Sequence, residues 1–276
     1  MSTYLPDYQQ SGSHIYFTAS PLGPPMAANS RPFPIQRSTT GEEASFEGYA
    51  AFHRRRVEET IALISQFGPP AGPVLDVGAS PLSSQLPRIW TGREVHVLDP
   101  DTSWNERLRC TEVHFHEGSL MDECLPLPEG AFAVTLASEV FEHLPECPEH
   151  LLNRLARVTA PGGIVGVTIP NQARLVNRVR LLLGRSILEA PSSAYHRPWM
   201  GYGHLHEYTL GELRTDFHDP GLRPVALGAI DPYDRGRFNG PICLMKWLHL
   251  TGWREVLYVV FRRVPEGEVS HTLSPS

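Results

Sequence analysis

Short apolar runs alternate with stretches of helical periodicity along most of the chain. Runs rich in Val, Ile and Leu and bounded by Gly, Pro or Asp predict buried strands. Seven such strands are expected, over residues 74–77, 94–98, 112–116, 131–137, 164–169, 222–230 and 255–262. Strands that alternate with helices in this rhythm predict a doubly wound α/β fold, with a mainly parallel sheet covered on both faces.

Apolar residues spaced three and four positions apart predict the helices between these strands. Helices are expected over residues 45–67, 82–90, 172–185 and 238–250, and another runs from Pro148 to the break at Pro161-Gly162-Gly163. Thr209 and Glu212 form the capping-box pattern of one more helix start. In the first helix, the run Arg54-Arg55-Arg56 is expected to lie on a solvated face.

The two ends of the chain lack any apolar period. Residues 1–44 are rich in Pro, Ser, Gly and Thr, which predicts a flexible N-terminal arm, and residues 266–276 are expected to be a tail. Residues 45–265 then form one domain. Within it, residues 170–208 follow a strand and contain a basic helix and an aromatic loop, which is typical of a substrate lid.

Composition narrows the possible partners. The 276 residues are 41% hydrophobic and carry a formal charge of −6, which disfavours wholesale binding to a phosphate backbone. Nucleic acid is therefore not an expected partner. The four cysteines form no C-x-x-C motif and no secretory signal precedes them, so a cytoplasmic location is expected. No apolar run approaches the roughly 18 residues of a membrane span, and no membrane partner is expected.

Candidate chemistry begins at Val74-Leu75-Asp76-Val77-Gly78-Ala79-Ser80-Pro81. An acid inside an apolar strand needs a partner, and Gly78 lets the backbone leave the strand sharply and approach a ligand. Asp99 ends the second strand 23 residues after Asp76, close to the spacing of a ribose-binding acid in doubly wound nucleotide sites. The turn alone also fits an ordinary parallel strand, but strand, spacing and Asp76 together favour a ribose-binding role for Asp99.

Four segments, in this order, resemble the class I S-adenosylmethionine-dependent methyltransferases. They are Val74 to Ser80, Val97-Leu98-Asp99, Ser138-Glu139-Val140-Phe141-Glu142-His143-Leu144-Pro145, and Pro161-Gly162-Gly163 with its strand to Pro170-Asn171. The resemblance covers residues 45–262. It implies a Rossmann-like, seven-stranded, mostly parallel sheet with an antiparallel last strand and a lid inserted after the fifth strand. It also implies S-adenosyl-L-methionine as methyl donor and S-adenosyl-L-homocysteine as product.

The same resemblance implies the residues that bind the cofactor. They are Asp76, Gly78, Ala79 and Ser80 around the methionine end, Asp99 at the ribose, Pro100, Ser119 and Leu120 around the adenine, and Ser138 at the end of the fourth strand. Ser80 replaces a family glycine, which a cofactor without pyrophosphate tolerates but NAD does not. Ser119 stands where many members carry an acid for the adenine amino group.

A hydroxyl acceptor must lose its proton near the transition state, and histidine is the side chain best matched to that task. His143 leaves the fourth strand beside the cofactor turn, and His204 lies where the lid returns. We therefore expect His143, His204 and Glu142 to be the catalytic candidates. The alternative is that Glu142 and His143 only brace the loop that carries them.

A metal is not expected, although one arrangement would suit it. Glu139, Glu142 and His143 stand at positions i, i+3 and i+4, so they would share one face if the segment were helical. Such a set could hold a divalent cation that lowers the pKa of a bound hydroxyl. The pattern is similar to the metal-dependent small-RNA 2′-O-methyltransferases and the ubiquinone-pathway O-methyltransferases. In the former a later histidine completes the site, and His204 matches it.

Three functions remain open. The first is O-methylation of a small organic molecule, such as a natural product or other secondary metabolite, which the acidic balance and the aromatic loop favour. The second is metal-assisted RNA 2′-O-methylation, for which the basic helix over residues 172–185 is the only electrostatic support. The third is a non-catalytic cofactor-binding scaffold. A homodimer built through the N-terminal arm is a further possibility.

Overall fold

The computed structural model describes residues 9–11, 14–16, 53–109, 111–188, 204–233 and 251–265. The chain divides into two units, Met1–Thr39 and Thr40–Ser276. In the first unit, β1 (Gln9–Ser11) pairs with β2 (His14–Tyr16) in an antiparallel ribbon, which the sequence pattern did not predict. The assignment of residues 1–44 to a flexible arm stays a prediction.

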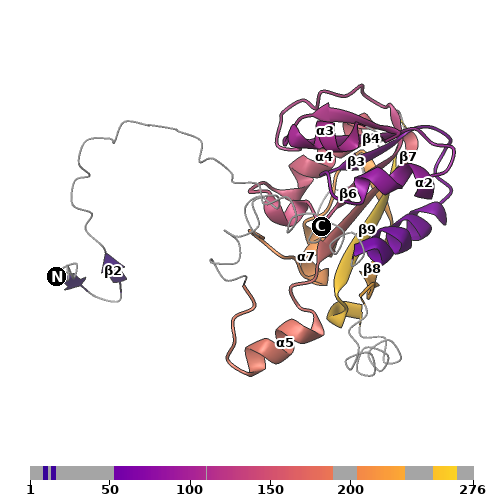
Figure 1. The fold of residues 1–276 in the computed structure, drawn as a ribbon. Coiled ribbons are helices and arrows are strands. Elements are labelled where there is room, and N and C mark those ends of the chain that lie inside the picture. The colour runs from indigo at the N-terminus through magenta and orange to yellow at the C-terminus, as the bar shows by residue number, and fades with distance from the viewer. Residues whose placement is uncertain are drawn as a thin grey trace. The chain divides into compact units, whose positions relative to one another are not determined.

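The second unit is built on a seven-stranded sheet with the order β5-β4-β3-β6-β7-β9-β8 (Figure 1). The strands are β3 (Val74–Val77), β4 (Val95–Asp99), β5 (Val113–Glu117), β6 (Phe132–Ser138), β7 (Thr159–Pro170), β8 (Leu222–Ile230) and β9 (Val256–Arg263). The last strand in the chain, β9, runs antiparallel to both of its neighbours, and the other six are mutually parallel. The predicted Rossmann-like sheet with an antiparallel last strand is confirmed.

Helices cover both faces of this sheet, as the apolar pattern predicted. They are residues 53–65, α2 (Leu86–Ile89) after the 3₁₀ turn η1 (Ser83–Gln85), α3 (Ser103–Leu108), α4 (Pro148–Val158) and α7 (Leu210–Thr215). A further helix, α5 (Leu175–Leu182), lies beyond the end of β7. The short α3 was not predicted. The predicted helix over residues 238–250 and the first part of the one over residues 45–67 lie outside the described residues.

Alternate residues of the central strand β3 divide the core between the two faces. Leu75 belongs to one buried cluster with Leu151 and Leu155 of α4, whereas Val74 belongs to another with Ile64 of the first helix. All four residues of β3 are buried. Strands buried on both faces read as near-continuous apolar runs, which is why the periodicity located them.

Two local predictions are adjusted by the structure. β7 begins at Thr159, directly after α4, so Pro161-Gly162-Gly163 lies inside the strand and does not separate the helix from it. The helix predicted over residues 82–90 is a 3₁₀ turn followed by a single α-helical turn with Pro87 near its start. The capping box of α7 forms in both directions between Thr209 and Glu212, as predicted. Within the described residues, no helix is both long enough and apolar enough to cross a membrane.

A histidine cluster lies on the paired strands β4 and β5. The His96 ring stacks on His114 and on His116, with ring centroids 4.8 and 5.1 Å apart, and His96 Nδ1 lies 2.8 Å from His116 Nε2. Glu94 Oε1 lies 3.2 Å from His114 Nε2. Burial lowers the pKa of His96 and of His116, and the neighbouring imidazoles lower both further, whereas Glu94 opposes the fall at His96. The fold therefore disfavours protonation of both rings relative to the unfolded chain.

This cluster predicts a loss of stability on acidification. Because the pKa values of His96 and His116 are depressed in the fold, the unfolded chain binds more protons once the pH falls below the ordinary histidine range. The raised pKa of Asp76 acts in the opposite sense in the parent and in every variant, so the test compares His116→Gln with the parent. Between pH 7.5 and pH 5.5, we expect the melting temperature of His116→Gln to gain a few degrees relative to that of the parent. Circular dichroism melts would measure this, with the exposed His218→Gln as the matched control. Identical pH slopes in His116→Gln and the parent would contradict the prediction.

Candidate functional site

A cavity of about 470 Å³ opens at the carboxyl ends of β3, β4 and β6, where the strand order reverses. This is the place where open α/β sheets bind their ligands. Every residue predicted to bind the cofactor lines the cavity: Asp76, Gly78, Ala79, Ser80, Asp99, Pro100, Ser119, Leu120 and Ser138. Glu139 and His143 line it as well, whereas Glu142 and His204 are not among its lining residues.

The turn after β3 depends on Gly78. Its φ of +88° lies in the left-handed region, and a Cβ at this position would come within 2.8 Å of Val140 Cγ2. The Gly78 amide donates a hydrogen bond of 2.9 Å to the Leu98 carbonyl, which ties the turn to β4. A side chain here would therefore force the turn away from β4 or push Val140 into the cavity.

Asp76 is buried beneath this turn. Its Oδ2 accepts a hydrogen bond of 3.2 Å from Ser83 Oγ, and Ser83 Oγ in turn accepts one of 2.9 Å from the Ser80 amide. Burial raises the pKa of Asp76 to about 7, although the Ser83 hydrogen bond and the nearby Arg56 act in the opposite direction. The carboxyl is thus poised to change its protonation state when a charged ligand arrives.

Asp99 is held rigidly at the end of β4. Its Oδ2 accepts a hydrogen bond of 2.7 Å from the Ala79 amide, and its Oδ1 accepts one of 2.8 Å from the Asp101 amide. Burial raises the pKa of Asp99, and these two backbone bonds oppose the rise. Since each carboxylate oxygen has more than one lone pair, both retain capacity to accept from a pair of hydroxyls.

Arg56 is a site residue that the sequence pattern missed. Arg54 and Arg55 are exposed and pair with acids one turn later, but Arg56 is only 4% exposed, lines the cavity, and places Nη1 3.1 Å from Glu139 Oε2. The expectation that all three arginines lie on a solvated face is therefore wrong for Arg56. Arg56 stands four residues before Thr60, so the two residues lie on the same side of the helix, and Thr60 is buried. This spacing was the signal that could have placed Arg56 on the inward side.

Glu139 is separated from the acid and the histidine that follow it. It has a left-handed φ of 58°, rare for a residue with a side chain, and its amide donates a hydrogen bond of 2.9 Å to the Thr168 carbonyl. Only Phe141–His143 forms a turn of 3₁₀ helix. The condition that the segment be helical from Glu139 onward is not met, because the chain turns sharply at that residue.

Glu142 is completely buried. Neither of its carboxylate oxygens accepts a hydrogen bond from the described part of the chain. Burial raises the pKa of Glu142 well above its ordinary value, and the charge of Glu139 raises it further. The Glu142 carbonyl accepts hydrogen bonds from the amides of Leu205 and His206, at 2.7 and 3.2 Å. These bonds bring the last part of the predicted lid against the loop that leaves β6.

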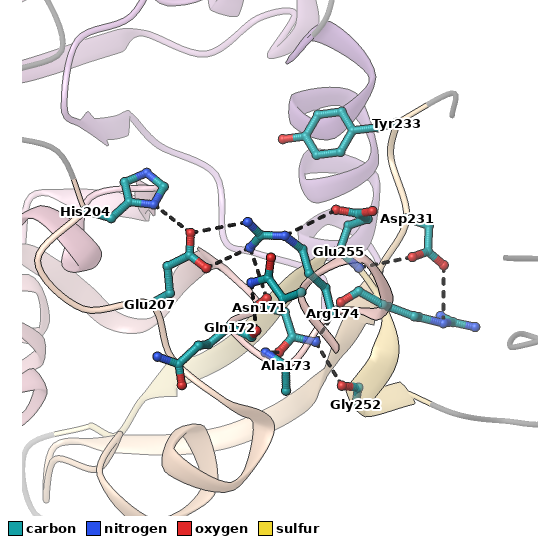
Figure 2. Close-up of polar contacts among 12 residues, drawn as sticks. Asn171, Gln172, Ala173, Arg174, His204, Glu207, Asp231, Tyr233, Gly252 and Glu255 are labelled. Carbon is teal, nitrogen blue, oxygen red and sulfur yellow. Dashed lines mark hydrogen bonds and ion pairs between the residues drawn. The ribbon is translucent and has the colours of Figure 1, made fainter. Parts of the chain in front are cut away.

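His143 and His204 meet across this junction, with ring centroids 5.0 Å apart and planes inclined by 74°. Figure 2 shows His204 directed at Glu207, with 2.9 Å between Nδ1 and Oε1. Glu207 Oε2 in turn lies 2.8 Å from Arg174 Nη1. Burial alone would raise the pKa of Glu207, but the His204 hydrogen bond and the Arg174 charge outweigh it and hold the pKa below its ordinary value.

Asn171 positions Arg174 in this chain of contacts. Its Nδ2 donates to the carbonyls of Gly252 and Arg254, at 3.0 and 2.6 Å, and its Oδ1 accepts from the Ala173 amide at 2.9 Å (Figure 2). The end of β7 is thereby fastened to the segment before β9. Arg174 sits between Glu207 and Glu255, with 3.8 Å from its Nε to Glu255 Oε2.

One group of side chains in the described residues could hold a metal ion. Glu142, His143 and His204 each offer one ligand atom, and these atoms lie within 4.8 Å of one another. Glu139, the fourth residue of the predicted set, is not in this group and pairs with Arg56. Four aromatic residues of the predicted lid lie outside the described residues: Tyr195, His196, Trp199 and Tyr202.

Comparison with solved structures supports the fold. One chain of the complex between the Haloferax volcanii Trm112 methyltransferase activator and a methyltransferase has a TM-score of 0.52 and 17% identity, with 81% of this chain and 95% of that chain covered. An S-adenosylmethionine-dependent methyltransferase from Thermotoga maritima has a TM-score of 0.49 and 15% identity, covering 81% of this chain and 96% of that one. At 17% identity, the likeness to the first of these concerns the fold alone.

The sequence itself assigns the family. No curated protein matches it significantly. A family model described as "Methyltransferase domain" matches residues 49–227, which is more than half of the 276 residues and contains all nine predicted cofactor-binding positions. The chain therefore belongs to the methyltransferase-domain family and is a class I S-adenosylmethionine-dependent methyltransferase.

Proposed function

We propose that the enzyme transfers the methyl group of S-adenosylmethionine to a hydroxyl oxygen of a small organic acceptor, such as a natural product or other secondary metabolite. The observation that carries this proposal is the contact of His204 with Glu207, 2.9 Å from Nδ1 to Oε1. A carboxylate at Nδ1 selects the tautomer whose Nε2 has a free lone pair. His204 can then accept a proton at Nε2, next to His143.

The proposed cofactor site uses charge at the methionine end and hydroxyl recognition at the ribose. Asp76 would face the cationic amino group, and Arg56 would bind the carboxylate through guanidinium N–H groups. Asp99 would accept hydrogen bonds from the ribose hydroxyls. Pro100, Ser119 and Leu120 line the same cavity farther along, where the adenine would lie.

The chemical step is a displacement at the methyl carbon. The acceptor oxygen forms a bond to the methyl group, the electron pair of the S–CH₃ bond returns to sulfur, and S-adenosylhomocysteine leaves. The hydroxyl proton passes to His204 Nε2. Because the sulfonium is already a good leaving group, the protein mainly aligns the reactants, excludes water and removes that proton. Glu207, itself held by Arg174, would stabilise the protonated imidazole.

The other two predicted catalytic residues have different proposed parts. His143 lines the cavity and faces the His204 ring, so it would contact the acceptor. Glu142 is completely buried and does not line the cavity, and its carbonyl binds the two amides that follow His204. We assign Glu142 to positioning of His204. The non-catalytic scaffold hypothesis is not retained, because the chain belongs to an enzyme family.

A metal-assisted form of the same reaction is the second candidate. The donor set fits a divalent cation, because Glu142, His143 and His204 converge and the Glu142 carboxylate is buried without a hydrogen-bond partner in the described residues. The Glu207 carboxylate on His204 is the usual outer partner of a metal-binding histidine. A bound cation would lower the pKa of the acceptor hydroxyl. Methylation of RNA by this route, a cytoplasmic location and a homodimer all stay predictions.

The general-base proposal predicts oxygen methylation that depends on His204. With labelled S-adenosylmethionine and a panel of phenols, catechols, alcohols and amines, we expect label on oxygen. His204→Asn should lower kcat by roughly 10²–10⁴-fold, with unchanged affinity for S-adenosylhomocysteine.

Glu207→Gln should lower kcat less than His204→Asn does. The double variant should be no slower than His204→Asn alone, since Glu207 acts through His204. The exposed His218→Asn is the matched control. Transfer to nitrogen or carbon only, or full activity of His204→Asn, would sink the proposal.

The proposed role of Asp76 predicts that cofactor binding strengthens as the pH rises. The pKa of Asp76 is about 7 in the free protein, so below that pH the carboxyl is neutral and must lose a proton to pair with the amino group. We expect the Kd for S-adenosylhomocysteine to rise by up to about tenfold for each pH unit below 7. Calorimetry in two buffers of different ionisation enthalpy should detect proton release, and Asp76→Asn should abolish it. A pH-independent Kd would exclude this role.

The metal-assisted alternative predicts specific cation binding. Mn²⁺ titration followed by electron paramagnetic resonance should show a site that is lost in both Glu142→Gln and His204→Asn. Chelation should then abolish methyl transfer and added Mn²⁺ should restore it. Glu94→Gln, at the separate histidine cluster, controls for adventitious binding there. Full activity after exhaustive chelation would leave the metal-free general-base reaction as the mechanism.

A further inference from the structure

The helix α5 exposes an apolar surface to solvent. Val176, Val179, Leu182 and Leu183 are 36%, 44%, 86% and 64% exposed. Val176, Val179 and Leu183 stand at i, i+3 and i+7, so they lie on one side of the helix, and Leu182 adjoins Val179. We call these four side chains the α5 apolar face. In Figure 1, α5 stands beyond the sheet, apart from the helices that cover it.

The opposite side of α5 carries the contacts that tie the helix to the segment before it and to Trp253, although Leu181 on that side is 57% exposed. Asn177 is buried, and its Nδ2 donates a hydrogen bond of 2.8 Å to the Gln172 carbonyl. Arg178 Nε donates one of 2.6 Å to the Ala173 carbonyl, and its guanidinium lies 4.8 Å from the centroid of the Trp253 ring. These contacts hold the α5 apolar face outward.

Positive charge surrounds this face. Residues 172–188 contain four arginines and no Asp or Glu, although the whole chain carries a formal charge of −6. Arg174 and Arg178 serve as anchors, whereas Arg180 and Arg185 are exposed. An exposed apolar strip flanked by arginines is the pattern of a helix that lies in a lipid interface and attracts anionic headgroups.

Other occupants fit this surface less well. A second copy of the chain, docked by two-fold symmetry, would bring Arg180 and Arg185 close to their own equivalents and repel. A nucleic acid would engage the arginines but would leave Leu182 and Leu183 in water. A surface of anionic phospholipid can bury the apolar side chains and pair with the arginines at the same time.

We propose that α5 docks the enzyme peripherally on anionic membranes, with the α5 apolar face among the acyl chains and Arg180 and Arg185 at the lipid phosphates. The absence of a spanning segment among the described residues is compatible with this, because an interfacial helix does not cross the bilayer. The sequence-based expectation of no membrane partner considered only spanning runs. The proposal does not depend on which atom accepts the methyl group.

Vesicle flotation tests it with the full-length chain. We expect flotation with vesicles of equal parts phosphatidylcholine and phosphatidylglycerol, and none with phosphatidylcholine alone. Arg180→Gln and Arg185→Gln should each weaken binding by roughly fivefold and reduce its salt dependence.

Leu182→Ser/Leu183→Ser should abolish flotation while circular dichroism and S-adenosylhomocysteine binding stay unchanged, because α5 lies outside the cofactor cavity. Leu205→Ser is the matched control, since Leu205 is 55% exposed but lies outside α5.

Three results would overturn the proposal. One is equal flotation with neutral and anionic vesicles, or none with either. Another is self-association in sedimentation velocity that disappears in Leu182→Ser/Leu183→Ser without any vesicle binding. The third is salt-sensitive RNA binding that is lost in Arg180→Gln and unaffected by Leu182→Ser/Leu183→Ser.

Discussion

The structure depends on keeping carboxyl groups inside an apolar sheet, where water does not solvate their charge. Asp76 lies in a strand that is buried on both faces, and burial raises its pKa to about 7. Ser83 and Arg56 partly offset that cost, and both come from segments that must pack against β3 to reach it. A charged ligand at the carboxyl end of the sheet would complete the compensation. The cavity therefore lies beside a buried carboxyl group that the fold by itself compensates only in part.

A second buried acid, Glu142, links the loop that leaves β6 to the segment before α7. Glu142 receives no hydrogen bond at its carboxylate from the described residues, yet its carbonyl binds the amides of Leu205 and His206. Those bonds bring residues from two distant segments together and set the His204 ring beside His143. The end of β7 also contributes to this junction, because Asn171 fixes the backbone from which Arg174 reaches Glu207. The same short stretch of chain also sets the direction of α5.

Most of the fold follows from local patterns. The strands were predictable because parallel strands buried on both faces are continuous apolar runs, and their ends were located within a few residues, except at β7, where pairing extends back to Thr159. The residues that line the cavity at the switch point were predictable because a glycine turn and two acids at a fixed spacing mark that point in such sheets. The short helix α3 was missed because six residues are too few to establish a period.

The sequence by itself determined the sheet, the cofactor turn and the family. Only the tertiary structure decided which charged residues face inward. In the sequence, Arg56 belongs to a run that is expected to be exposed, but the packing of its helix on β3 buries it. The spacing of Glu139 suggests a helix, but Glu139 has a left-handed backbone conformation and pairs with Arg56. The contact between His204 and Glu207 is local, but its place beside His143 is not. Burial and long-range pairing are set by packing between segments far apart in the chain, which no local pattern records.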